Sequence, residues 1–91
     1  MTAGGFKITN QRILRKNSLV GAFYLELPSG LIIRGVMLFE KNGKRWVSFP
    51  SKEYVKPDGT KQYSPLLEFV NRDIADKFQA LVLPLVEQVL L

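Results

Sequence analysis

The amino-acid sequence predicts an α+β domain, in which an antiparallel β-sheet meander of four to five strands is followed by one C-terminal α-helix. Three turn signals divide the first two-thirds of the chain: Pro28-Ser29-Gly30, Asn42-Gly43 and Pro57-Asp58-Gly59. Proline presets the backbone for such turns, and glycine can adopt the positive φ that they require. Apolar residues between the turns recur with a period near two, which indicates strands. After Phe69 the period becomes helical.

The predicted strands follow one another between these turns. Residues 6–15 are the first candidate, with a polar side interrupted by Ile13. Residues 18–27 place one set of apolar side chains on one face, namely Leu19, Phe23, Leu25 and Leu27. Residues 31–40 form a further predicted strand. One of its faces carries Leu31, Ile33, Met37 and Phe39, and the other carries Ile32, Arg34, Val36, Leu38 and Glu40. The second set is only partly polar, so we expect a helix or another subunit to cover part of it.

The C-terminal segment has the features of a helix. Asn71 is a favourable N-cap, and Asp73 and Asp76 lie in the first turns, where the helix dipole favours acids. Apolar residues recur at helical spacing: Ile74, Phe78, Leu81, Val82, Leu85 and Val89. Pro84 lacks the backbone N–H that a helix interior needs, so we expect the helix to kink or end there.

A second group of apolar residues lies beside this first set on the predicted helix and widens its apolar side. Its members are Leu83, Val86 and Leu90. Because the apolar side is too wide to be covered by packing against one surface, we expect this second group to form the interface of a homodimer or a higher oligomer.

Length and composition set the class of the protein. A chain of 91 residues with 46% hydrophobic and 23% charged residues is typical of one globular domain, here residues 1–91, with residues 1–5 expected to be disordered. No segment approaches the roughly 20 apolar residues that a membrane span requires, and the N-terminus lacks the apolar core of a signal peptide. We therefore expect a cytoplasmic protein without a membrane partner.

The composition also argues against catalysis. The chain has no His and no Cys, which excludes His-based triads and zinc clusters built on these residues. Asp73 and Asp76 are the only closely spaced acids, and they fit a helix N-terminus. Ser51 and Lys52 are adjacent, and neighbours in an extended chain point to opposite sides. We expect no enzyme activity, no cofactor, no metal and no small-molecule substrate.

The positive charge is concentrated in the predicted strands and turns. The net charge is +5, with eleven Lys and Arg against four acids in residues 1–61, and two against four in residues 62–91. A polyanion would therefore be drawn to the strands, and we expect nucleic acid to contact Lys41, Lys44, Arg45, Lys52, Lys56 and Lys61. The alternative is that these lysines protect exposed strand edges. Arg12, Arg15 and Lys16 form a further basic cluster that fits a solvated turn.

Two tyrosines are interleaved with these lysines. Tyr54 and Tyr63 can stack on unpaired bases, or they can form a cross-strand pair in a hairpin centred on Asp58-Gly59. The sequence leaves both interpretations open.

From Leu31 to about Leu83, the order of features resembles the stage V sporulation protein G family. The resemblance is carried by Gly43, the Trp46-Val47-x-Phe49-Pro50-Ser51-Lys52 run, Asp58-Gly59, Pro65 and Lys77-Phe78-Gln79. It implies a small α+β fold, dimers built through strand pairing and a role as a nucleic-acid-binding regulator, with DNA favoured over RNA. It also implies contacts from Arg72 and Lys77 at the start of the helix, whereas Ala75 stands where a second basic residue would be expected.

Two other functions are consistent with the sequence. The first is a protein-interaction module that uses the apolar helix and the sheet edges, with charge serving solubility. The second is non-specific binding of single strands, similar to the positive-cofactor type of dimer, in which a curved sheet face holds unpaired bases.

Overall fold

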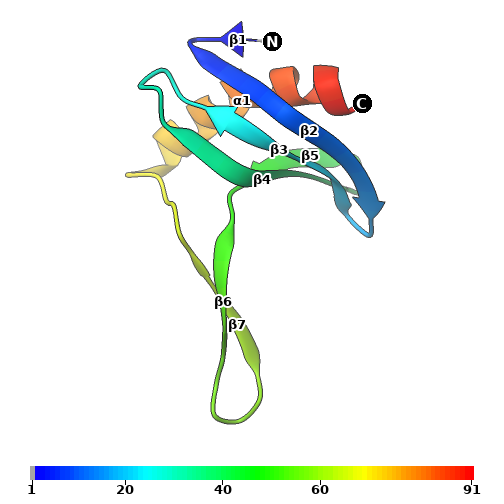
Figure 1. The fold of residues 1–91 in the computed structure, drawn as a ribbon, viewed down its shortest axis with the longest axis vertical. Helices are drawn as coiled ribbons and strands as arrows, with labels where there is room; N and C mark the ends of the chain where they lie inside the picture. Colours follow the sequence, from blue (N-terminus) through cyan, green and yellow to red (C-terminus); the bar gives the residue numbers. More distant parts are fainter. Residues whose placement is uncertain (1) are drawn as a thin grey trace.

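A computed structural model describes residues 2–91 and has the α+β architecture that the sequence predicts (Figure 1). The larger sheet is antiparallel and has five strands in the order β1-β2-β3-β4-β5. Its strands are β1 (Thr2–Ala3), β2 (Phe6–Lys16), β3 (Leu19–Glu26), β4 (Ile32–Lys41) and β5 (Lys44–Ser48). A separate hairpin consists of β6 (Ser51–Val55) and β7 (Lys61–Pro65), and the helix α1 (Arg72–Leu90) follows it.

The N-terminal residues differ from the expectation of disorder. Thr2 pairs with Lys7 and Ala3 pairs with Phe6, so these residues form the short edge strand β1. Gly4 and Gly5 make the connecting turn, and both have positive φ. Met1 lies outside the described residues.

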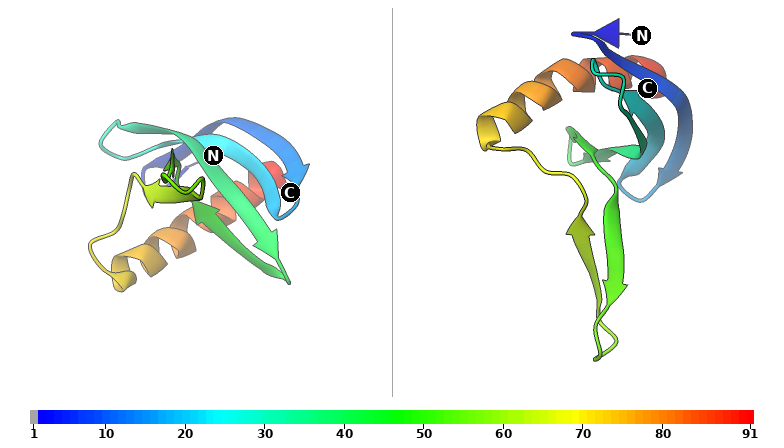
Figure 2. Two further views of the ribbon diagram at one scale, coloured as in Figure 1. Left: turned by 90° about the horizontal axis from the view of Figure 1, so that it is seen from below. Right: turned by 60° about the vertical axis from the view of Figure 1, so that its left-hand side comes forward.

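The helix packs on one face of the larger sheet, and the strands curve around it (Figure 2). The core between the two layers consists of side chains that are at most 8% exposed: Ile8, Val20, Phe23, Leu25, Val36, Leu38, Val47, Phe78, Val82, Leu85, Val86 and Leu90. Burial of this apolar surface is the main stabilising contribution in so small a domain.

The helix begins where the sequence predicts. Asn71 has extended backbone angles, and its Oδ1 accepts a hydrogen bond from the Ile74 amide at 3.0 Å. The helix does not end at Pro84, which is exposed, and it continues to Leu90.

The expected oligomer interface on the helix is wrong for two of its three residues. Val86 is 0% exposed and Leu90 is 1% exposed, because both face the sheet of the same chain. Leu83 is half-buried and packs against the core. Ile74 and Leu81, which the helical stripe assigns to the core, are instead 44% and 38% exposed. The buried face is thus rotated around the helix from the expected one.

The β6–β7 hairpin, which we call the arm (residues 51–65), projects away from the rest of the molecule (Figures 1 and 2). All but one of its residues are exposed, and the exception, Gln62, is half-buried. The arm therefore has no core of its own within the described residues.

Candidate nucleic-acid interface

The helix leaves one face of the five-stranded sheet uncovered, and we call it the open face. In Figure 1 the helix lies behind the strands. Cross-strand partners share a face of an antiparallel sheet, so the register identifies the members of the open face. It includes the pairs Lys7–Glu26, Thr9–Tyr24, Arg12–Ala22, Lys16–Leu19, Met37–Ser48, Phe39–Trp46 and Lys41–Lys44.

A bulge in β4 determines which side chains reach the open face. Phe23 pairs with Val36, but Leu25 pairs with Ile33, so β4 has one extra residue in this interval. Gly35 lies there with a φ of 76°, a conformation that glycine adopts readily and other residues rarely adopt. The alternation therefore changes phase, and Arg34 comes to the same face as Met37 and Phe39.

The open face carries two contacts that involve aromatic rings. Phe39 and Trp46 are stacked, with ring centroids 5.7 Å apart and planes inclined by 14°. The guanidinium of Arg34 lies 5.7 Å from the centre of the Tyr24 ring. Trp46 is 38% exposed although it packs on Phe39. Exposed aromatic rings on a sheet are suited to stacking with unpaired bases.

Six cations lie on the same face: Lys7, Arg12, Lys16, Arg34, Lys41 and Lys44. All six are exposed, and none makes an ion pair with another described residue. Among the residues that the register places on this face, Glu26 is the one acid. The open face is therefore strongly basic, and its charges are free to contact an anion.

A depression of about 310 Å³ lies on this surface. It is lined by Asn10, Gln11, Arg12 and Tyr24. A bulge in β2 creates it, since Thr9 pairs with Tyr24 and Arg12 with Ala22, and Asn10 adopts a φ of 52°. Two amide side chains and a guanidinium beside an aromatic ring supply hydrogen-bonding and stacking groups of the kind that bind a base edge.

The eight cations predicted from the sequence do not form one surface. Lys41 and Lys44 lie on the open face, as a cross-strand pair at the β4–β5 turn. Lys52, Lys56 and Lys61 lie on the arm, and Arg72 and Lys77 lie on the helix.

Arg45 is on the opposite side of β5 from the open face. Its Nη1 donates to Glu87 Oε2 at 2.8 Å, and its Nε donates to Glu40 Oε2. The hydrogen bond to Glu87, followed by that to Glu40, raises the pKa of the Arg45 guanidinium above its ordinary value. Arg45 thus connects β4 and β5 to the helix, and its charge is engaged within the fold.

Two further predicted cations have acidic neighbours. Lys61 Nζ lies 3.6 Å from Glu53 Oε1, and Arg72 Nε lies 3.3 Å from Asp76 Oδ1. Both pairs are well exposed, so they weaken the local positive charge without fixing the side chains firmly.

The two tyrosines of the arm do not form the cross-strand pair that one interpretation expects. The register pairs Tyr54 with Gln62 and Tyr63 with Glu53, which places the two rings on opposite faces of the hairpin. Tyr54 Oη donates to Gln62 Oε1 at 2.6 Å.

The most prominent members of the open face were not among the residues selected from the sequence. They are Tyr24, Arg34, Phe39 and Trp46. Strict alternation along residues 31–40 grouped Phe39 with Ile33, which faces the helix, and so concealed the surface. Gly35 was the available signal, because an isolated glycine within a strand indicates a bulge.

Comparison of the chain with protein-family models, with curated proteins and with solved structures gives no match. Within residues 2–91, no cluster of acidic side chains could hold a metal ion. The helix of this part of the chain is not long and apolar enough to cross a membrane. The functional argument therefore depends on the open face itself.

Proposed function

We propose that this protein binds nucleic acid and that an unpaired strand lies across the open face. The observation that carries the proposal is the combination, on one uncovered sheet face, of the exposed ring of Trp46 and the half-buried rings of Phe39 and Tyr24 with cations that have no acidic partner among the described residues. Phosphates would contact the lysines and arginines, while bases would stack on Trp46 and occupy the depression beside Tyr24. A small regulatory or accessory role in nucleic-acid metabolism belongs to this proposal.

A single strand fits this surface better than a duplex. The aromatic rings lie on the face of the sheet, and they can reach base faces only when the bases are unstacked from a partner strand. The helix adds little to duplex recognition, because Arg72 is paired with Asp76 and Lys77 is the other cation of its first two turns.

The experiment uses Trp46, which is the only tryptophan of the chain, as a reporter. Titration with a thymidine oligonucleotide should quench its fluorescence, and a duplex of equal length should compete poorly. If four to six phosphates are contacted, log K should fall with log salt with a slope of about −3 to −4 for a single strand. A salt-independent signal, or unchanged fluorescence at low salt, would remove the proposal.

A further inference from the structure

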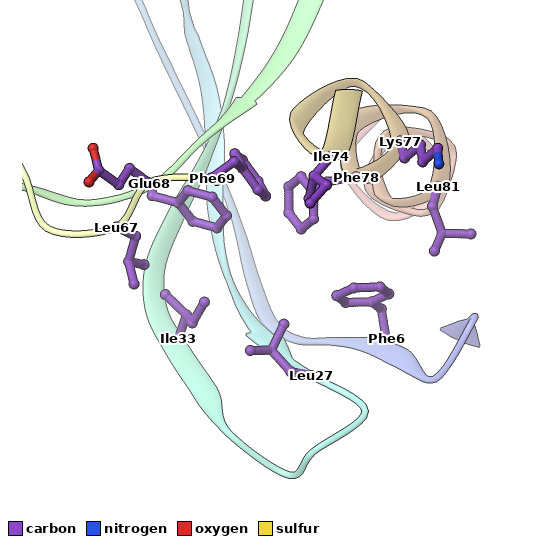
Figure 3. Close-up of a pocket in the computed structure, with 11 residues that line it drawn as sticks. Phe6, Leu27, Ile33, Leu67, Glu68, Phe69, Ile74, Lys77, Phe78 and Leu81 are labelled. Carbon is purple, nitrogen blue, oxygen red and sulfur yellow. The ribbon is translucent and has the colours of Figure 1, made fainter. Parts of the chain in front are cut away.

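The end of the molecule at the root of the arm contains an apolar groove with a volume of about 410 Å³ (Figure 3). Its walls come from several separate parts of the chain and include Phe6, Leu27, Ile33, Phe69, Ile74 and Leu81. Its base is fixed by the ring of Phe78, whose centroid lies 5.8 Å from that of Phe6 and 5.1 Å from that of Phe69.

The groove is suited to apolar side chains. Glu68 and Lys77 are the charged residues that line it, and Figure 3 shows their charged groups at the periphery, directed away from the apolar side chains. Val70, next to the groove in sequence, is 89% exposed, and Leu66 is 60% exposed. So large an apolar surface on a small domain is typical of an interaction site.

The arm has a face that matches this groove. The register places Val55 with Lys61 and Glu53 with Tyr63 on one face, which we call the apolar face of the arm. Val55 is 61% exposed and Tyr63 is 66% exposed, while the charges of Glu53 and Lys61 lie 3.6 Å apart and offset each other. The opposite face carries Lys52 and the hydrogen-bonded pair of Tyr54 and Gln62.

The isolated chain is more extended than a compact protein of its size. Its accessible surface is 6402 Å² for 10.3 kDa, whereas a compact monomer of that mass has about 5,400 Å². Its radius of gyration is 14.0 Å, compared with about 12 Å expected for this length. The difference of roughly 1,000 Å² is similar to the surface that one partner contributes to a stable interface, about 800 Å².

We propose that the groove receives the apolar face of the arm from a second copy of this chain, so that two copies exchange arms in a two-fold dimer. The arm begins directly after Phe49 and Pro50 and ends directly before residues 66–69, so it emerges at the rim of its own groove. It points away from the larger sheet and the helix (Figure 2). A two-fold axis beside the base of the arm places the arm of each copy across the groove of the other copy. Such an exchange closes the assembly at two copies.

The charges of the two surfaces support a second copy as the occupant. The arm carries three lysines against Glu53 and Asp58. The segment beside the groove carries three acids, Glu68, Asp73 and Asp76, against Arg72 and Lys77. The arm is therefore slightly basic and the groove's surroundings slightly acidic, which favours their association. A two-stranded hairpin without a partner is marginally stable, so docking would also stabilise the arm.

Cross-linking tests this arrangement directly, because the native chain has no cysteine. One preparation carries Val55→Cys, a second carries Ile74→Cys, and the two are mixed and treated with a short bismaleimide. The mixture should give a covalent dimer joined between positions 55 and 74. The matched control replaces Ile74→Cys with Ala80→Cys, on an exposed part of the same helix outside the groove, and its yield should be lower by about tenfold.

Sedimentation of full-length variants provides the second measurement. Tyr63→Asp and Ile74→Asp should each raise the dimer dissociation constant by about a hundredfold, as expected for loss of a central apolar contact. Ser64→Asp, on the other face of the arm, and Ala80→Asp should remain dimeric. All four positions are solvent-accessible, so an unchanged circular dichroism spectrum should show that each variant folds.

Two results would overturn the dimer. One is that the native protein stays monomeric at high micromolar concentration, which would mean that the groove does not bind the arm of a second copy. The other is equal cross-linking to positions 74 and 80. Neither result depends on nucleic acid, so this inference and the proposed function fail separately.

Discussion

Gln79 of the helix pairs with the backbone of Val47 as a neighbouring strand would. Its Nε2 donates to the Val47 carbonyl at 2.8 Å, and its Oε1 accepts from the Val47 amide at 3.0 Å. Val47 belongs to β5, the edge strand of the sheet, and its backbone groups at that edge have no strand beside them in the described part of the chain. One side chain thus protects the edge and fixes the helix against it.

Replacing Gln79 should destabilise the fold more than its half-buried position suggests. Gln79→Ala leaves two partly buried backbone groups of Val47 without partners, which costs about 1 to 3 kcal/mol for such groups. Urea unfolding should show this as a lower midpoint with an unchanged slope. Gln88→Ala, on an exposed part of the same helix, is the control and should change the stability by less than about 0.5 kcal/mol. Equal effects would contradict the assigned role.

Two glycines should respond to alanine for different reasons. Gly35 has a φ of 76°, and an added Cβ would meet no atom within 4 Å, so Gly35→Ala costs only backbone strain, about 1 to 2 kcal/mol. At Gly21 an added Cβ would lie 2.3 Å from the carbonyl oxygen of Arg12 in the neighbouring strand. Gly21→Ala must separate β2 from β3, so we expect the larger loss.

Thermal unfolding of both glycine variants provides the comparison. Gly35→Asn is the matched control, because asparagine tolerates positive φ better than alanine does, and it should recover part of the loss. If Gly35→Ala lowers the melting temperature more than Gly21→Ala does, the assignment of steric conflict to Gly21 and of strain to Gly35 is contradicted.

The turn of the arm should weaken in acid. Asp58 Oδ1 accepts from the Thr60 amide at 2.9 Å, and this bond, followed by one from the Thr60 hydroxyl, lowers the pKa of Asp58 below its ordinary value of 3.8. Because the pKa is lower in the folded arm, the carboxylate's contribution is fully present above about pH 3.8 and is lost as the pH falls through the folded pKa.

NMR titration should detect this change locally, in the amide of Thr60 and the rings of the arm, before the larger sheet is affected. Asp58→Asn can still accept the hydrogen bond but does not titrate, so the acid-dependent change of the arm should disappear in that variant. A titration midpoint for Asp58 at or above 3.8 would contradict the expected shift.

The local sequence signals were sufficient for the elements of the fold. Pro28-Ser29-Gly30, Asn42-Gly43 and Asp58-Gly59 mark the turns, and Asn71 marks the start of the helix, because each acts through its own backbone geometry or side-chain hydrogen bonds. A candidate fold class can be derived from such signals alone. The structure differs where a residue's position depends on a distant part of the chain.

The faces of the elements were harder to predict. The bulge at Gly35 shifts the alternation of side chains in β4. An uninterrupted alternation therefore places Phe39 on the same face as Ile33, whereas the two lie on opposite faces. On the helix, Val86 and Leu90 are buried because the sheet curves toward that side, a property that helical spacing does not contain. The candidate site was therefore only partly predicted: Lys41 and Lys44 belong to it, whereas Arg45 is engaged by acids of the same fold.

The open face should be sensitive to the loss of a single ring. Stacking of a base on an aromatic side chain contributes about 1 to 3 kcal/mol, so Trp46→Ala should weaken binding of a labelled single strand by roughly 5- to 150-fold. Trp46→Phe keeps an aromatic surface beside Phe39 and should retain most of the affinity. Arg34→Ala should also weaken binding, because it removes both a cation and the contact over Tyr24.

Arg72→Ala is the matched control for Arg34→Ala, since it removes the same charge from the helix, away from the open face, where Arg72 is paired with Asp76. Fluorescence anisotropy at one fixed salt concentration compares the variants, because affinities for nucleic acid depend steeply on salt. If Arg72→Ala weakens binding as much as Arg34→Ala, the contact depends on net charge alone. The sheet face would then have no special role, since its rings add affinity only when bases lie directly on them.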